Sequence, residues 1–286
     1  MIKLLALDLD GTVLDSQGRI PEANKRAIKT AEANGVLVTI ATGRRFRDCR
    51  PVGLELELNA PLITHNGALL KYGRTLEAVW YSLLPSETAE EIIRVGRLFG
   101  GDALVSTDPH GKGHLFYNNI SDANSPVHNY LNWSRRLHGD EAEDAVVHVD
   151  DLIECARDSE VIHISFSGTC PAMEKLSEVL VAELKDTVTI LATVYPKLNF
   201  TLLDILPPNA SKGSCLEKLS AVNGLLPEHV MCIGDNFNDL HMLEFAGTPV
   251  IMGNADASLL DRPEFYKTLT NDESGVAAAI ERFILV

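Results

Sequence analysis

Two carboxylates two residues apart follow the first apolar segment of this 286-residue chain. The segment Leu4-Leu5-Ala6-Leu7 is predicted to be a buried parallel strand, and Asp8 and Asp10 come directly after it. Because side chains alternate along a strand, the two carboxylates share a face, and Gly11 then lets the chain turn out of the sheet. Like charges this close favour a bound divalent cation, and oxygen ligands favour Mg²⁺. The alternative is an ordinary Asp-Gly turn at the strand end.

Polar residues also follow other apolar segments at the points where those segments end. Segments 36–41, 61–64 and 230–233 are predicted as further strands, and ligands in open α/β sheets bind at the carboxyl ends of the strands. A helix over 21–34 joins the first two strands into a parallel unit. We therefore expect one site from residues at these strand ends and at the start of a later helix, namely Asp8, Asp10, Thr42, Lys212 and Asp235.

These residue types suit phosphoryl transfer. The Asp8 carboxylate can attack phosphorus and form an aspartyl-phosphate, which splits one difficult displacement into two easier ones. Mg²⁺ held by Asp8 and Asp235 would shield the attacking oxygen from the negative charge of the substrate, and Lys212 with the Thr42 hydroxyl would hold the other phosphoryl oxygens. Asp10 is placed to protonate the leaving alcohol and later to deprotonate water.

Some neighbouring residues have two interpretations. Arg44 either contacts the substrate or forms a surface ion pair, and Asn66 either supports its turn or touches the substrate. Asn238 and Asp239 could cap the following helix, and Asp239 could also bind the metal. Lys212 alone could be a solvated lysine, but a cation in the first turn of a helix is unfavourable, and this cost favours a functional role.

The order of elements predicts an α/β fold, a Rossmann-like doubly wound parallel sheet, with an inserted α+β domain. Helix and strand patterns alternate in 1–82 and again in 206–286, which we expect to form one core domain. Between them, 83–205 has a different rhythm and is expected to form a second domain with its own core. Within it, Ser125 is predicted to cap a helix that has Pro126 at its first position.

Composition describes a globular chain with a strongly acidic balance. The formal net charge is −15 and 45% of the residues are hydrophobic. Such a charge disfavours nucleic acid and anionic membranes as partners. The five cysteines are scattered without a paired spacing, and no segment approaches membrane-spanning length, so we expect reduced thiols and a cytoplasmic protein. The sequence leaves the oligomeric state open.

Together these residues resemble the haloacid dehalogenase-like hydrolase superfamily, and in particular its Cof-type phosphatases with an inserted C2-type α+β cap. The resemblance covers the whole chain. The four motifs that carry it are, in chain order, Asp8-Leu9-Asp10-Gly11-Thr12, Thr42-Gly43-Arg44, Ser211-Lys212-Gly213 and Gly234-Asp235-Asn236-Phe237-Asn238-Asp239.

The resemblance implies a Mg²⁺-dependent phosphatase acting on a small phosphorylated metabolite, with the cap covering the site and choosing the substrate. Asp8 would be the nucleophile, and Asp10 the general acid/base and a metal ligand through its backbone carbonyl. Asp235 would be the acidic metal ligand. Phosphate contacts are implied for the backbone at Leu9 and for Thr42, Gly43, Lys212 and Asn238.

Two alternatives remain at this point. A phosphosugar mutase of the same superfamily would pass the phosphoryl group to a sugar instead of to water. A receiver-like signalling protein also places acidic residues, a threonine and a lysine around a phosphorylated aspartate. The large insert and the presence of Asp10 argue against the second alternative, because a signalling domain needs its phosphoryl group to persist.

Overall fold

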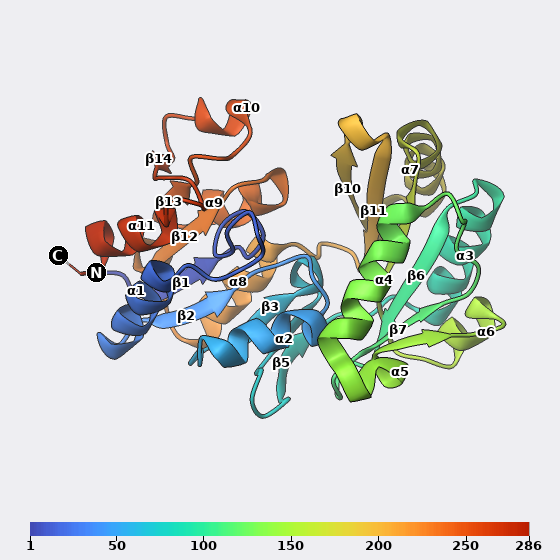
Figure 1. The fold of residues 1–286 in the computed structure, drawn as a ribbon, viewed down its shortest axis with the longest axis horizontal. Helices are drawn as coiled ribbons and strands as arrows, with labels where there is room; N and C mark the ends of the chain where they lie inside the picture. Colours follow the sequence, from blue (N-terminus) through green and yellow to red (C-terminus); the bar gives the residue numbers. More distant parts are fainter. Residues whose placement is uncertain (286) are drawn as a thin grey trace. The chain divides into compact units, whose positions relative to one another are not determined.

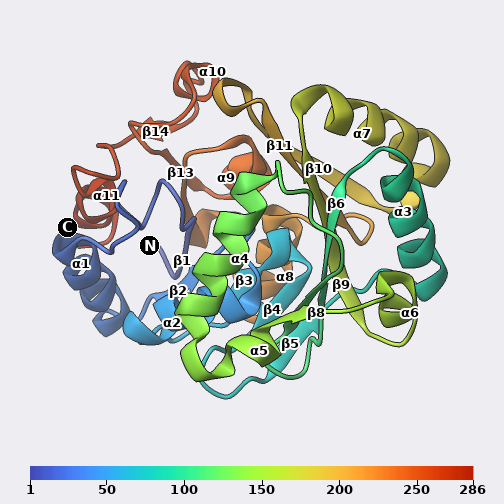
Figure 2. The ribbon, with the colours of Figure 1, turned by 45° about the vertical axis from the view of Figure 1, so that its right-hand side comes forward.

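The structure is a computed structural model in which residues 1–285 are described. It divides the chain into two compact units (Figures 1 and 2). The first contains Met1–Arg44, Cys49–Val79 and the residues from Ser211 onward, and the second contains Arg45–Asp48 and Trp80–Ala210. The sequence placed the boundaries at 82/83 and 205/206. The units divide a few residues away from those positions, and the second unit also includes a four-residue segment of the first half of the chain.

The first unit is built on a five-stranded, fully parallel sheet, which confirms the predicted α/β core. Its strands follow each other in the order β14 (Tyr266–Lys267), β13 (Thr248–Ile251), β12 (Val230–Gly234), β1 (Leu4–Leu7) and β2 (Leu37–Ile40). All four residues of β1 are fully buried because β1 lies between two neighbours and helices cover the sheet. This explains why its sequence is continuously apolar instead of alternating.

Helices α1 (Glu22–Ala33) and α11 (Gly275–Phe283) pack together against this sheet (Figure 1). Asn24 of α1 is fully buried between them, where its side chain accepts a hydrogen bond from the Ala277 N–H and donates to the Val13 carbonyl. The remaining helices of the first unit are α8 (Lys212–Val222), α9 (Leu240–Phe245), α10 (Ala257–Leu260) and the larger part of α2 (Phe46–Glu55).

The predicted strand at 61–64 forms, but it lies in a separate small sheet. Here β3 (Leu62–Thr64) pairs antiparallel with β4 (Leu69–Lys71), and β5 (Ala78–Tyr81) completes the sheet. An isolated bridge between Ala41 and Ile63, and not a continuous ladder, joins β3 to the end of β2. The turn between β3 and β4 is therefore held beside the carboxyl end of β2.

The second unit is a mixed six-stranded sheet with helices, as expected for the α+β insert. Its strand order is β10 (Thr189–Tyr195), β11 (Phe200–Leu206), β9 (Val161–Gly168), β6 (Asp102–Thr107), β7 (His114–Tyr117) and β8 (Val146–His148). Only β7 and β8 pair in parallel. Its helices are α3 (Ser86–Leu98), α4 (Ser125–His138), α5 (Ala142–Ala145), α6 (Leu152–Arg157) and α7 (Cys170–Leu184).

The predicted N-cap of α4 was wrong by one residue. Asn124 is the cap, and its side-chain oxygen accepts from the Val127 N–H, so that Ser125 and Pro126 occupy the first turn. The other end of the same amide donates to Asp102 at 2.6 Å and to Ser167. A serine hydroxyl could not make the cap and these sheet contacts at once, so the longer amide takes the position.

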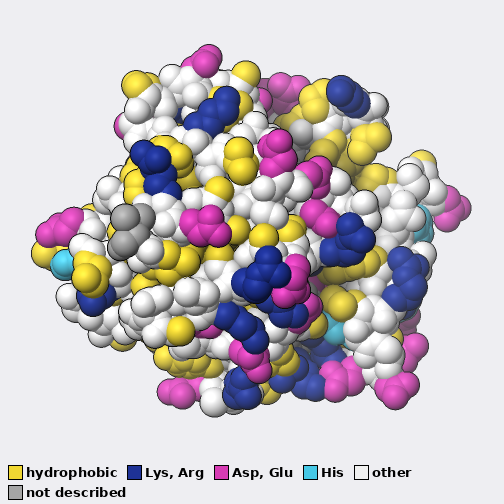
Figure 3. All heavy atoms as spheres, turned by 60° about the vertical axis from the view of Figure 1, so that its left-hand side comes forward, with side chains coloured by type: hydrophobic (Ala, Val, Ile, Leu, Met, Phe, Trp, Pro, Cys, Tyr) yellow, Lys and Arg dark blue, Asp and Glu magenta, His cyan; other side chains and the backbone are white. Residues whose placement is uncertain are grey.

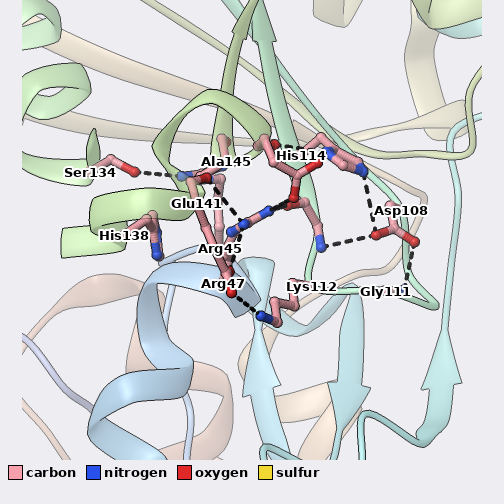
Figure 4. Close-up of polar contacts among 12 residues, drawn as sticks. Arg45, Arg47, Asp108, Gly111, Lys112, His114, Ser134, His138, Glu141 and Ala145 are labelled. Atoms are coloured by element: carbon pink, nitrogen blue, oxygen red, sulfur yellow. Dashed lines mark hydrogen bonds and ion pairs between the residues drawn. The ribbon is translucent and has the colours of Figure 1, made fainter. Parts of the chain in front are cut away.

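A buried charge cluster joins the segment Arg45–Asp48 to α4 inside the second unit. Figure 4 shows the Arg45 guanidinium beside the Ser134 hydroxyl of α4 and the Ala145 carbonyl of α5, to both of which it donates. The Arg45 guanidinium donates to both oxygens of Asp48, each at 2.9 Å, and Asp48 also accepts from the Tyr130 hydroxyl at 2.7 Å. His138 lies 2.8 Å from the same carboxylate. Burial alone would raise the pKa of Asp48, but Arg45 and the hydrogen bonds outweigh it and hold that pKa well below its usual range.

On the face drawn in Figure 3, acidic and basic side chains are interspersed and are not gathered by sign. All five cysteines are free thiols. Within residues 1–285, the helices are too short or too polar for any of them to cross a membrane.

Candidate active site

Asp8 stands at the carboxyl end of β1 and is only 4% exposed. Its backbone N–H continues the parallel ladder by donating to the Ile233 carbonyl of β12 at 2.9 Å. The ladder therefore fixes the position of the residue, and one carboxylate oxygen accepts a hydrogen bond from Lys212 Nζ at 2.6 Å. The residues predicted to be nucleophile and phosphate-binding lysine are thus in direct contact, although 204 positions separate them in the chain.

Lys212 is the first residue of α8 and is 1% exposed. Ser211 precedes it as the predicted N-cap and forms a capping box with Ser214. The ammonium group bridges Asp8 and Asp239, with both N–O distances at 2.6 Å. Burial alone would lower the pKa of Lys212, but the two carboxylates outweigh it and raise that pKa. A cation at this unfavourable helix position is therefore held by two buried anions.

The loop after β12 is folded around Asp239, which is fully buried. Its second carboxylate oxygen accepts from the backbone N–H groups of Asp235 and Asn236, both at 3.0 Å. Gly234 is required here because a Cβ at this position would lie 2.7 Å from the Asp239 carboxyl group. Asp239 therefore shapes the loop that presents Asp235 and also pairs with Lys212.

Three carboxylates meet at this point and could hold a cation. Oxygens of Asp8, Asp235 and Asp239 all lie within 4.8 Å of one another. Burial, together with the charges of Asp239 and Asp235, raises the pKa of Asp8 despite the opposing effect of Lys212. Burial and Asp239 likewise raise the pKa of Asp235 to about 6. Both raised pKa values reflect negative charges that lie close together, with the Lys212 ammonium group opposing them. The three carboxylates therefore fit a divalent cation that prefers oxygen ligands.

Asp235 also packs closely against the turn that follows β1. The Thr12 hydroxyl donates to one Asp235 oxygen at 3.2 Å. Gly11 has φ +83°, and a Cβ there would overlap the other Asp235 oxygen. The Leu9 side chain of the same turn is fully buried, so its backbone is the part that could contact a ligand.

The Asp10 carboxylate is not part of the cluster of Asp8, Asp235 and Asp239, and 56% of its side chain is exposed. Both of its carboxylate oxygens accept hydrogen bonds from the Arg44 guanidinium, from Nε at 2.8 Å and from Nη2 at 2.5 Å. Of the two interpretations of Arg44, the structure shows an ion pair, and its partner is the residue predicted to be the general acid/base.

Thr42, Gly43 and Asn66 form one interlocked set of loops. The Thr42 N–H donates to the Ile63 carbonyl, and the Asn66 N–H donates to the Thr42 carbonyl at 3.1 Å. A Cβ on Gly43 would lie 3.1 Å from the Asn66 amide, so the loops touch closely. The Asn66 side-chain oxygen accepts from Asn238 at 3.1 Å, which ties the loop after β12 to the same set. The predicted phosphate-contact residues therefore occupy adjacent loops of the first unit.

The sequence patterns predicted no role for Asn254 and no specific contact for Thr12. Asn254 follows the end of β13, and its side chain donates to the Gly11 carbonyl at 2.9 Å and accepts from the Asn271 N–H at 2.9 Å. The strand-end rule that found Asp8 and Asp235 would also have pointed to Asn254, because β13 is the next strand of the same sheet.

Comparison with known proteins agrees with this geometry. Residues 5–280 match the family model described as haloacid dehalogenase-like hydrolase. The chain is 29% identical to the 5-amino-6-(5-phospho-D-ribitylamino)uracil phosphatase YcsE of Bacillus subtilis over 99% of this chain and 96% of that protein. It is 29% identical to the HMP-PP phosphatase of Serratia proteamaculans over 89% of this chain and 85% of that protein.

Solved structures show the same fold over the full length. A haloacid dehalogenase-like hydrolase from Bacteroides thetaiotaomicron superimposes with a TM-score of 0.82 and 26% identity, covering 99% of each chain. Together with the family model, which spans nearly all of the described residues, this excludes the receiver-like alternative. The chain belongs to the haloacid dehalogenase-like hydrolase family and is a phosphatase.

Proposed function

We propose that this phosphatase hydrolyses a small phosphorylated metabolite with the help of Mg²⁺ and through an aspartyl-phosphate on Asp8. The observation that carries the proposal is the buried contact of Asp8 with Lys212 beside the carboxylates of Asp235 and Asp239. A carboxylate fixed at a strand end and paired with one ammonium group is suited to attack a phosphoryl group, which brings its own negative charge into the site.

In the first step, an Asp8 oxygen forms a bond to phosphorus while the bond from phosphorus to the leaving oxygen breaks. Asp10 donates a proton to that oxygen, so that an alcohol leaves. Lys212, the Thr42 hydroxyl and the backbone around Gly43 are proposed to hold the phosphoryl oxygens. This step produces the aspartyl-phosphate and an ionised Asp10.

In the second step, a water oxygen attacks phosphorus and the bond to Asp8 breaks. Asp10 accepts the proton of the attacking water, which regenerates the free Asp8 carboxylate and the protonated acid and releases inorganic phosphate. Asp10 is more than half exposed, which gives it access to both the leaving group and the incoming water.

The residues proposed to hold Mg²⁺ are Asp8, Asp235 and the backbone carbonyl of Asp10, and the ion would neutralise charge on the phosphoryl oxygens. Asp239 was also predicted as a ligand and belongs to the same cluster. Both of its oxygens already accept hydrogen bonds, from Lys212 on one side and from two backbone N–H groups on the other. We therefore assign to Asp239 the task of orienting Lys212 and the Asp235 loop.

The proposed substrate class is a small phosphomonoester such as a sugar phosphate. Two relatives that align over most of this chain are named 5-amino-6-(5-phospho-D-ribitylamino)uracil phosphatase and HMP-PP phosphatase, which supports this choice. The inserted unit, which has its own hydrophobic core, is proposed to select the substrate. A phosphosugar mutase would use the same chemistry but would return an isomerised sugar phosphate instead of inorganic phosphate.

The decisive experiment combines a trapping assay with a substrate screen. Acid quenching of the wild-type protein with labelled substrate should leave a hydroxylamine-sensitive phosphoryl group on the protein, and Asp8→Asn should abolish both this label and turnover of 4-nitrophenyl phosphate. EDTA should stop turnover and excess Mg²⁺ should restore it. Release of phosphate from a panel of sugar phosphates, nucleotides and cofactor phosphates would identify the substrate. Retained turnover in Asp8→Asn would disprove the nucleophile assignment.

A further inference from the structure

Arg44 lies just beyond β2 on a loop that hydrogen bonds hold in place. Its backbone N–H donates to the Thr42 hydroxyl at 3.1 Å, and its carbonyl accepts from the His65 N–H at 2.9 Å. The Asn66 N–H in turn donates to the Thr42 carbonyl. Because the loop is anchored on both sides, the point from which the Arg44 side chain leaves it is fixed.

From this loop the guanidinium reaches the turn after β1 and binds both oxygens of Asp10. Two parallel N–H···O bonds to one carboxylate constitute the strongest and most directional form of ion pair available to side chains. The arginine side chain is mostly buried, at 23% exposure, whereas that of Asp10 is 56% exposed. The better-anchored member of the pair is therefore Arg44.

An exposed aspartate without a fixed partner samples several rotamers, and most of them would point its carboxyl group away from a reacting oxygen. Proton transfer requires a heavy-atom separation near that of a hydrogen bond, so random orientation lowers the rate. The pairing with Arg44 leaves a second acceptor position on each Asp10 oxygen, because a carboxylate offers about four such positions in all. One of these positions can carry the proton that is transferred.

We propose that Arg44 is a positioning residue that orients the Asp10 carboxyl group toward the leaving oxygen. This inference rests on the proposed function, in which the proton of Asp10 moves to the leaving oxygen while that oxygen separates from phosphorus and Asp8 bonds to phosphorus. Arg44 acts through Asp10 and does not itself take part in these bond changes.

The experiment compares two classes of leaving group in the full-length protein with Mg²⁺ present. The ratio kcat/KM reports the steps up to the first irreversible one, here loss of the leaving group. 4-Nitrophenolate leaves without a proton, whereas an alkoxide such as that of a sugar phosphate requires one. Arg44→Gln should lower kcat/KM for a sugar phosphate by on the order of tenfold to a hundredfold, a part of the full effect of general acid catalysis. For 4-nitrophenyl phosphate, kcat/KM should stay within about threefold of the wild-type value.

Two further variants test whether Arg44 acts through Asp10. Asp10→Asn should show the same dependence on the leaving group, and adding Arg44→Gln to it should cause no further loss, because two residues that act as one unit are not additive. Arg44→Lys keeps the charge but loses the two-point geometry, so it should resemble Arg44→Gln if orientation is what matters. Wild-type values in Arg44→Lys would disprove orientation as the cause.

Two other outcomes would contradict the positioning role of Arg44. An equal loss for both substrates would mean that Arg44 binds the phosphoryl group directly, and no loss for either would mean a surface ion pair only. The matched control is Arg19→Gln, which removes another arginine that contacts one aspartate, Asp15, through two nitrogens in the same unit. It should leave both substrates unaffected. If the aspartyl-phosphate assay on Asp8 fails, the proposed function itself is wrong, whereas the variants of Arg44 test only the positioning of Asp10.

Discussion

Replacing Lys212 by Met should reveal how strongly the buried carboxylates depend on one ammonium group. The change keeps most of the apolar stem but leaves Asp8 and Asp239, each of which is 2.6 Å from Nζ in the structure, without their shared cation. Removing one partner of a buried ion pair costs about 3–5 kcal/mol. In EDTA at pH 7, the free energy of unfolding of the first unit should fall by about that amount.

The pH dependence of this loss has a definite sign. Burial and the neighbouring carboxylates raise the pKa of Asp8, whereas Lys212 lowers it, so removing Lys212 should make the native cluster hold a proton more strongly than it does in the wild type. In the unfolded chain the same carboxyl has a pKa near 3.8 and is ionised between pH 5 and 7. The native variant therefore binds one more proton, and its stability should rise as the pH falls, by about 1.4 kcal/mol per pH unit. Because the native wild type also takes up protons in this range, the loss relative to wild type should shrink between pH 7 and 5 by less than about 1.4 kcal/mol per pH unit.

The assay must report on the first unit. Both tryptophans, Trp80 and Trp133, belong to the second unit, so fluorescence would follow the wrong part of the chain. Hydrogen exchange of peptides that contain β1 and β12, measured by mass spectrometry at pH 5, 6 and 7 and corrected for the intrinsic exchange rate, reports on the correct sheet. Lys29→Met, which removes an exposed lysine paired with Glu57 at 2.7 Å, is the control and should change little at any pH. A loss for Lys212→Met that does not vary with pH, or that equals the control, would refute the reasoning.

Three further predictions concern other parts of the molecule. Asp48→Asn should destabilise the second unit by about 3–5 kcal/mol at pH 7 because it leaves the Arg45 guanidinium buried without an anion. Since the pKa of Asp48 is lowered in the folded state, the stabilisation by Asp48 is present above its ordinary pKa of 3.8 and is lost at lower pH. Urea unfolding followed by tryptophan fluorescence should therefore show the stabilities of variant and wild type converging at low pH. Gly11→Ala should reduce kcat/KM by on the order of a hundredfold because the new methyl group displaces Asp235. The control is Gly18→Ala: Gly18 has φ +73° and nothing lies within 4 Å of a Cβ added there, so activity should stay near the wild-type value. Mg²⁺ at about 100 times its dissociation constant should slow hydrogen exchange in β1 by an amount equivalent to about 2.7 kcal/mol, and Asp235→Asn should remove this protection.

Some features could be predicted because their signal is local in sequence. The apolar run of β1 followed by Asp8, and the Ser211 cap before Lys212, each depend on residues within one or two turns of each other. Strand-end geometry then places the acidic residues of different strands on one edge of a parallel sheet. The chemistry of the site could therefore be proposed before any coordinates were known.

Other features left no comparable signal. The helix at Phe46–Glu55 carries Pro51 in its interior, which disfavours a helix locally. Two residues of its first turn, Arg47 and Asp48, form hydrogen bonds with residues 97 and 82 positions later in the chain. The cap of α4 moved from Ser125 to Asn124 because Asn124 also bonds to Asp102 across the sheet. Local propensity cannot represent such a contact, because it arises only when distant strands pair.

The sequence by itself determined the α/β class, the four motifs and the residue types needed for phosphoryl transfer, because backbone periodicity and strand-end placement depend on near neighbours. Only the tertiary structure decided which charges pair. In the folded chain Lys212 pairs with Asp8 and Asp239. Arg44 pairs with Asp10, although the sequence allowed a substrate contact for Arg44 equally well. Partners of this kind are selected by distance in space and by the cost of burying an uncompensated charge, and neither quantity exists before the chain has folded.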